Sequence, residues 1–130
     1  MADEYESGGG SPIDMRAITQ LAEADDAGTR FLAEIIDVFL ADMGQRVRTI
    51  GERMSEGDHM GVAAAAHAIK GSCGHFGASR LMALSRHLEE CAKGKLEPTE
   101  GIETAIESMI AETERVRLAL EAFRAGRTSA

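Results

Sequence analysis

The chain of 130 residues is long enough for one domain with a single modest core. Its formal net charge of −8 argues against a nucleic acid partner and against an anionic membrane surface, because both attract Lys and Arg rather than carboxylates. It contains no apolar run of membrane-spanning length, and its acidic start, MADEYESGGGSP, lacks the layout of a signal peptide, so we expect a cytoplasmic protein.

Residues 1–10 are acidic and then glycine-rich, and we expect them to form a disordered tail before a helical domain at 11–126. A short helix is expected to begin with Ser11 as its cap and to run through Glu23. The next helix is predicted from about 29 to 55, because apolar residues recur there at steps of three and four. This apolar stripe consists of Phe31, Ile35, Val38, Phe39, Met43, Val47, Ile50 and Met54.

Three further helices are expected in the rest of the chain. Asp58 can cap the third helix, which should end near Gly74 or Gly77. A fourth is expected over residues 79–93 and a fifth over about 99–125, each with one apolar seam. No segment of useful length alternates at period two, and aromatic residues are few. The expected fold class is therefore all-α, an antiparallel up-and-down four-helix bundle with a short additional N-terminal helix.

The third helix carries the stretch AHAIKGSCGHFGASRL, in which His67 is expected to point away from the core. At about 100° per residue, Val62, Ile69 and Phe76 fall close to the side of the helix opposite His67. An outward face normally carries Glu, Lys, Arg and Gln, but this one has small residues around one imidazole, as a docking surface for a partner would. The residues within roughly 60° of His67 are Met60, Ala63, Ala64, Gly71 and Gly74.

Charge around His67 favours the approach of an anion. No Asp or Glu occurs between Met60 and Leu88, although the chain contains 22 of them. Lys70 lies one turn after His67, where its ammonium can either remain solvated or pair with a phosphoryl group on the imidazole. A neutral imidazole is a competent nucleophile near neutral pH, so His67 is the candidate phosphoacceptor and Lys70 the candidate phosphoryl-stabilising residue.

A pattern of fixed spacing runs through and beyond this helix. Its positions are His67, Lys70, Gly71, Ser72, Gly77, Ala78 and Leu81. The pattern resembles the signature of histidine-containing phosphotransfer (HPt) domains, H-x-L-K-G-S-x-x-x-x-G-A-x-x-L. Ile69 stands where that family often has Leu, and Cys73 stands where a second Ser is common. The resemblance covers roughly residues 12–124, including the segments FLAEIIDVFLADM and LMALSRHLEECAKG.

The resemblance implies a phosphorelay intermediate without kinase activity of its own. His67 would accept a phosphoryl group from the aspartyl phosphate of a response-regulator receiver domain, hold it as phosphohistidine and pass it to another receiver. The implied partners are receiver domains, including those of a hybrid histidine kinase, and the magnesium ion would belong to the receiver. We expect the chain to bind no cofactor itself and to be a monomer.

Four further residues are placed near His67. His75 and His87 are interpreted as surface residues near the site. Arg80 and Arg86 are candidates for steering an acidic receiver, although a solvated position suits each of these two arginines better. His59, His67 and His75 are spaced by eight residues, about 12 Å of rise, which is too far for one metal ion. We therefore expect no metal site.

Two alternative functions remain open from the sequence. The first is an interaction module that binds a receiver or another partner through the small-residue face around His67 and is never phosphorylated. The second is the dimerisation and phosphoacceptor part of a sensor kinase. Against the second, Ala68 rather than Glu follows His67, no Pro lies nearby, and no ATP-binding segment follows in this sequence.

Overall fold

The computed structural model of the chain describes residues 12–23, 29–94 and 99–129. Every regular element in these ranges is helical, which confirms the all-α prediction. The tail predicted at 1–10 and the side chain of Phe31 lie outside what is described. The elements are α2 (Met15–Glu23), α3 (Thr29–Ser55), α4 (His59–Ser72), the short 3-10 helix η2 (Cys73–Phe76), α5 (Ser79–Ala92) and α6 (Thr99–Ser129).

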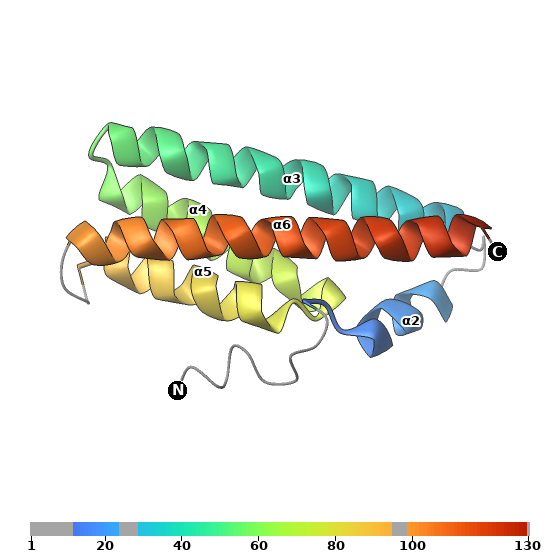
Figure 1. The fold of residues 1–130 in the computed structure, drawn as a ribbon. Coiled ribbons are helices and arrows are strands. Elements are labelled where there is room, and N and C mark those ends of the chain that lie inside the picture. The colour runs from blue at the N-terminus through green and yellow to red at the C-terminus, as the bar shows by residue number, and fades with distance from the viewer. Residues whose placement is uncertain (1–11, 24–28, 95–98, 130) are drawn as a thin grey trace.

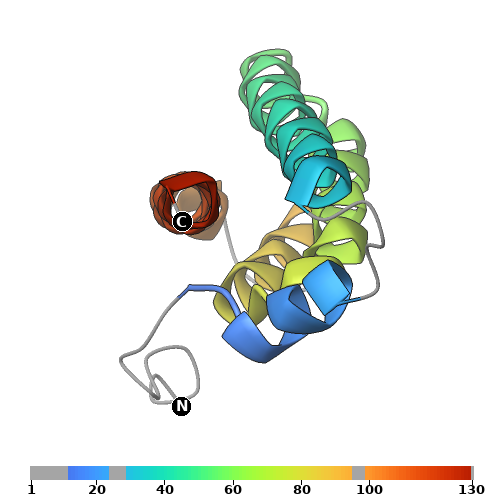
Figure 2. The same cartoon turned by 90° about the vertical axis from the view of Figure 1, so that its right-hand side faces the viewer.

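The four long helices lie side by side as a bundle, and α2 lies at one end of it, against η2 (Figures 1 and 2). Helix α4 packs between α3 and α5, and α6 packs against both α5 and α3, which closes the ring. Short connections join α3 to α4 and α4 to α5, so these neighbours run antiparallel. The predicted four-helix bundle with a short leading helix is confirmed.

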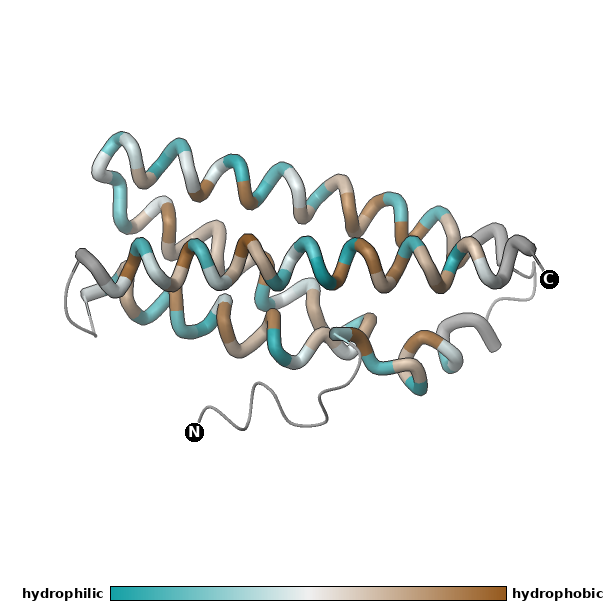
Figure 3. Tube along the Cα trace, in the orientation of Figure 1, coloured by the Kyte–Doolittle hydropathy of each residue, from teal (hydrophilic) through white to brown (hydrophobic). Residues whose placement is uncertain are grey.

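The core lies where the apolar stripes of the helices meet (Figure 3). The predicted core face of α4 is confirmed, since Val62 and Ile69 are fully buried. In α3 the prediction is wrong for Val38, which is 68% exposed, whereas Leu32 and Ile36 are buried instead. The run FLAEIIDVFL places apolar residues on more than one side of the helix, and only some of them face other helices.

The first helix begins at Met15, three residues later than predicted, and the predicted cap Ser11 lies outside the described residues. The Oδ1 atom of Asp14 accepts a hydrogen bond from the backbone N–H of Arg16 at 2.9 Å, as an N-cap side chain does. The backbone N–H of Asp14 donates to the carbonyl of Phe76, also at 2.9 Å. The second of these hydrogen bonds holds the start of α2 against η2.

Both ends of the segment that carries His67 are fixed by local contacts. Asp58 caps α4 as predicted, because its Oδ1 atom accepts a hydrogen bond from the Gly61 N–H at 2.9 Å. At the other end, η2 stops at Gly77, whose φ of 60° is in the left-handed region. A Cβ at this position would collide with the Cβ of Asp14, so glycine is also what allows α2 to approach.

No helix in the described ranges is long and apolar enough to cross a membrane. Even α6, the longest helix, carries charged residues along its length. The cytoplasmic location stays a prediction.

Candidate phosphoacceptor site

His67 lies on the outward face of α4, and its side chain is 65% exposed, which confirms the predicted orientation. Gly71 and Gly74 follow it on the same face, and a Cβ added at either position would meet nothing within 4 Å. The fold therefore does not require glycine at these two positions. Their small size instead leaves the surface beside the imidazole open to a partner.

One predicted member of this face is buried. Ala63 is only 2% exposed, whereas Met60 and Ala64 are exposed as predicted. On the helical wheel, Ala63 falls on the same side of α4 as Lys70, which contacts α5. The close packing of α4 against α5 covers a methyl group there, so the open face beside His67 does not include Ala63.

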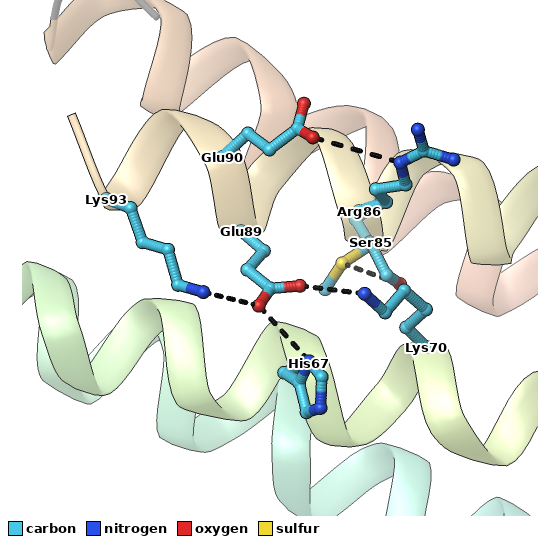
Figure 4. A network of polar contacts seen from close by, with 8 residues as sticks. His67, Lys70, Ser85, Arg86, Glu89, Glu90 and Lys93 are labelled. Atoms are coloured by element: carbon cyan, nitrogen blue, oxygen red, sulfur yellow. Dashed lines mark hydrogen bonds and ion pairs between the residues drawn. The ribbon is translucent and has the colours of Figure 1, made fainter. Parts of the chain in front are cut away.

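A carboxylate from α5 lies against His67 (Figure 4). The Oε2 atom of Glu89 is 3.1 Å from the His67 Nδ1 atom and accepts a hydrogen bond from the Lys93 Nζ atom at 2.9 Å. The Oε1 atom accepts one from the Lys70 Nζ atom at 3.1 Å. The side chain of Glu89 is only 9% exposed, and these three partners compensate for its burial. We call these four residues the Glu89 network.

The two lysines keep Glu89 ionised. The hydrogen bond from Lys93 is the largest influence, and together with Lys70 and His67 it lowers the pKa of Glu89 from 4.5 to about 2, against the opposing effect of burial. Glu89 is therefore a carboxylate at any pH near neutrality. Two ammonium groups and one carboxylate leave a net positive charge beside the imidazole, which favours an arriving phosphoryl group.

The contact with Glu89 determines which nitrogen of His67 is free to react. An ionised carboxylate accepts hydrogen bonds and donates none, so the Nδ1 atom must carry the proton. In the neutral ring the Nε2 atom then keeps its lone pair. Figure 4 shows that the Nε2 atom lies on the edge of the ring that points away from Glu89, so Nε2 is the exposed nucleophilic atom.

Sequence analysis missed both Glu89 and Lys93. The span without Asp or Glu ends at Leu88, and the next residue is the carboxylate that reaches His67 from α5, so the expectation of a carboxylate-free site is wrong. Two signals were available in the sequence. Glu89 and Lys93 are four residues apart on one helix, and Glu89 borders the apolar seam at Leu88, where a carboxylate needs partners.

Arg80 faces α6 instead of the His67 surface. Its Nε atom is 3.1 Å from the Oε1 atom of Glu112, a buried carboxylate of α6 that also pairs with Arg115 at 2.9 Å. This arrangement connects α5 to α6, which corrects the expected position of Arg80 beside the docking surface. His75 is exposed in η2, where it lines a hollow together with residues of α3.

No group of three or more His, Cys, Asp or Glu side chains in the described ranges is arranged to hold a metal ion. Cys73 and Cys91 are both buried, and burial raises the pKa of Cys73 to about 12, which keeps it protonated. That the chain needs no cofactor stays a prediction.

A comparison with known protein families matches residues 34–125 to the Hpt domain. The chain belongs to this family. The structure is also similar to the crystal structure of histidine-containing phosphotransfer protein B (HptB) from Pseudomonas aeruginosa PAO1, with a TM-score of 0.76. The two sequences are 27% identical, and the aligned region covers 86% of this chain and 93% of the HptB chain. A comparison with curated protein sequences gave no match.

Membership of the Hpt family confirms the resemblance seen in the sequence. Histidine phosphotransfer in a phosphorelay is the activity that this membership assigns, and receiver domains are the class of partner. The whole Glu89 network lies within the matched residues, whereas α2 lies before them.

Proposed function

We propose that this Hpt domain carries a phosphoryl group on the Nε2 atom of His67 from one receiver domain to another. The observation that best supports the proposal is an exposed imidazole whose Nδ1 proton is held by Glu89, which leaves the Nε2 lone pair facing the solvent. The open surface at Gly71 and Gly74 gives a receiver room to bring its phosphoaspartate to that atom.

The loading step requires no proton transfer. The Nε2 lone pair forms a bond to the phosphorus of the aspartyl phosphate, and the P–O bond to the aspartate breaks, with its electron pair leaving on the carboxylate. The ring of His67 keeps its Nδ1 proton and becomes a phospho-imidazolium cation. Glu89 accepts a hydrogen bond from that proton, and its negative charge stabilises the cation. Unloading is the reverse reaction with the aspartate of the second receiver as nucleophile.

Lys70 and Lys93 have separate roles in this proposal. Among the residues that the structure describes, Lys70 binds only the Oε1 atom of Glu89, and it lies one turn from His67 on the same helix. It can therefore turn toward a phosphoryl group on Nε2 and pair with it as a point charge. Lys93 binds the Oε2 atom and keeps Glu89 neutralised when Lys70 leaves, so it is a positioning residue that acts through Glu89.

The donor supplies the free energy of the reaction as an aspartyl phosphate, so the chain needs no nucleotide and no kinase activity of its own. A receiver domain of a hybrid histidine kinase is one donor of this kind. The magnesium ion and the acidic pocket that act on the aspartate belong to the receiver.

The test is to incubate the chain with each radiolabelled, phosphorylated receiver domain of the source organism. We expect one receiver or more to transfer the label to the chain as an acid-labile, alkali-stable adduct, and His67→Gln to abolish it. His87→Gln is the matched control, because His87 is an exposed histidine of α5 outside the network. Label that persists in His67→Gln would overturn the assignment. Receiver binding without any label would favour the interaction module instead.

A further inference from the structure

A hollow of about 470 Å³ opens on the surface between α3 and η2. Its apolar lining consists of Ile35, Val38 and Phe39 of α3 and Phe76 of η2. The rings of Phe39 and Phe76 are buried and pack with their centroids 4.8 Å apart, so the bottom of the hollow belongs to the core. The hollow has room for a bulky apolar side chain, and the close-packed core beneath it would make contact with that side chain.

Val38 stands at the rim of this hollow with 68% of its surface exposed. A single exposed apolar residue is ordinary on a protein surface. Here it continues the apolar lining of a hollow, so a partner that filled the hollow would also cover Val38. Burial of this continuous apolar surface would favour association.

The rim of the hollow is acidic. Glu34, Val38 and Asp42 follow one another at four-residue steps and form one ridge along α3. Glu34 is exposed, and Asp42 is half-buried and pairs with Arg46 at 3.5 Å. No Lys or Arg occurs among the described residues that line the hollow. An apolar side chain that carries a cation beside it therefore complements this surface better than one beside a carboxylate.

The hollow lies within reach of a partner that covers His67. Ser72 at the end of α4 and His75 in η2 line it, and they follow His67 by rises of roughly 8 Å and 14 Å. A stable protein interface buries about 800 Å² on each partner, a patch roughly 30 Å across. A domain centred near the Nε2 atom of His67 would therefore extend over the hollow on the α3 side.

We propose that this hollow is a specificity site for the receiver domain. It takes one bulky apolar side chain of the receiver, next to a Lys or Arg of the receiver that meets Glu34. The inference rests on the proposed function, and it adds which chemistry a receiver must present on the α3 side to be accepted.

The test measures transfer kinetics with the phosphorylated receiver that loads His67 fastest, at a series of receiver concentrations. We expect Val38→Asp to raise KM about tenfold or more and the milder Val38→Ala about two- to threefold, with the rate at saturating receiver unchanged. Glu34→Lys should raise KM about two- to fivefold at low salt and less at high salt. Phosphoramidate, which phosphorylates imidazole without a protein partner, should load all three variants at the wild-type rate.

Two exposed residues of α6 provide matched controls, and Leu118→Asp and Glu107→Lys should leave KM unchanged. An unchanged KM in Val38→Asp would overturn the inference while the proposed function stands. Equal losses with the receiver and with phosphoramidate would also overturn it, because the substitution would then act on His67 or on the fold. A wild-type dimer that Val38→Asp converts to a monomer would assign the hollow to a second copy instead. If phosphoramidate labels His67 but no receiver does, the proposed function fails, and this inference fails with it.

Discussion

The two surfaces that flank α4 beside His67 differ in chemical character. Toward α5, the imidazole meets a closed set of charged groups, with Glu89 held between Lys70 and Lys93. Toward α3, the surface is an apolar hollow with an acidic rim. The charged flank touches the reacting ring, whereas His67 is not among the described residues that line the hollow, so the apolar flank acts on a partner. The difference indicates that α5 serves the chemistry and α3 the recognition, so substitutions on the two flanks should change different quantities.

The largest expected effect comes from Glu89→Gln, which keeps the shape of the side chain and removes its charge. We expect loading and unloading of His67 to slow about 10- to 100-fold, because a hydrogen bond to a charged group contributes about 1.5–3 kcal/mol. Single-turnover rates with a receiver, and loading by phosphoramidate, should both fall. A fall in both is the signature of the α5 flank, since α3 variants should leave phosphoramidate loading intact.

Glu90→Gln is the control for this substitution. Glu90 is the next residue of α5, and it pairs with Arg86 at 3.8 Å instead of joining the network (Figure 4). Its loss should leave both rates unchanged. Wild-type rates in Glu89→Gln would remove Glu89 from the mechanism and leave the α5 flank without a chemical role.

The lowered pKa of Glu89 predicts how the stability of the α5 flank depends on pH. The folded-state pKa of about 2 lies below the ordinary value of 4.5, so the network stabilises the fold fully above pH 4.5 and loses that contribution as the pH falls through 2. The difference in free energy of unfolding between wild type and Glu89→Gln should therefore shrink as the pH falls from 4.5 toward 2. Urea unfolding across this range measures the difference, and a value independent of pH would contradict the network.

A smaller effect is expected for Lys93→Met, because Lys93 acts on His67 only through Glu89. We expect the pKa of Glu89, followed by carboxyl NMR, to rise toward its ordinary value of 4.5. Loading should slow about three- to tenfold, since Lys70 is then needed to neutralise Glu89 and is less free to meet the phosphoryl group. An unchanged pKa would show that Lys70 alone holds the carboxylate.

The smallest effect on loading is expected for Gly71→Ala, a substitution that lies between the two flanks. Because a Cβ there would meet nothing within 4 Å, Gly71→Ala should stabilise the helix by about 0.5–1 kcal/mol. Thermal unfolding gives the stability, and receiver loading should slow slightly while phosphoramidate loading does not. A loss of stability in Gly71→Ala would mean that the fold, rather than a partner, requires the glycine.

The bundle could be predicted from the sequence because each helix carries its own apolar seam and its own end signals. The Asp58 cap and the burial of Val62 and Ile69 depend on residues within one helix, so spacing alone was sufficient. The contact between Glu89 and His67 joins positions 22 residues apart on two helices. It depends on the register in which α4 packs on α5, and the periodicity of a single helix contains no information on that register.

The exposure of Val38 has a similar cause. Helix α3 is apolar on more than one side near its start, and which side is covered depends on where α4, α6 and α2 lie against it. Arg80 was misplaced for the same reason, because its partner Glu112 comes from α6. The errors at Val38, Arg80 and Glu89 therefore concern side chains whose surroundings are supplied by a different helix.

Gly77 connects the HPt motif to a helix that lies before the matched family region. Two requirements meet at this residue: a left-handed backbone, and the absence of a Cβ where Asp14 passes. In a chain that had lost α2, only the first requirement would remain, and asparagine can satisfy it. Among Hpt domains, asparagine at this position would therefore mark chains in which no leading helix is docked at this corner of the bundle.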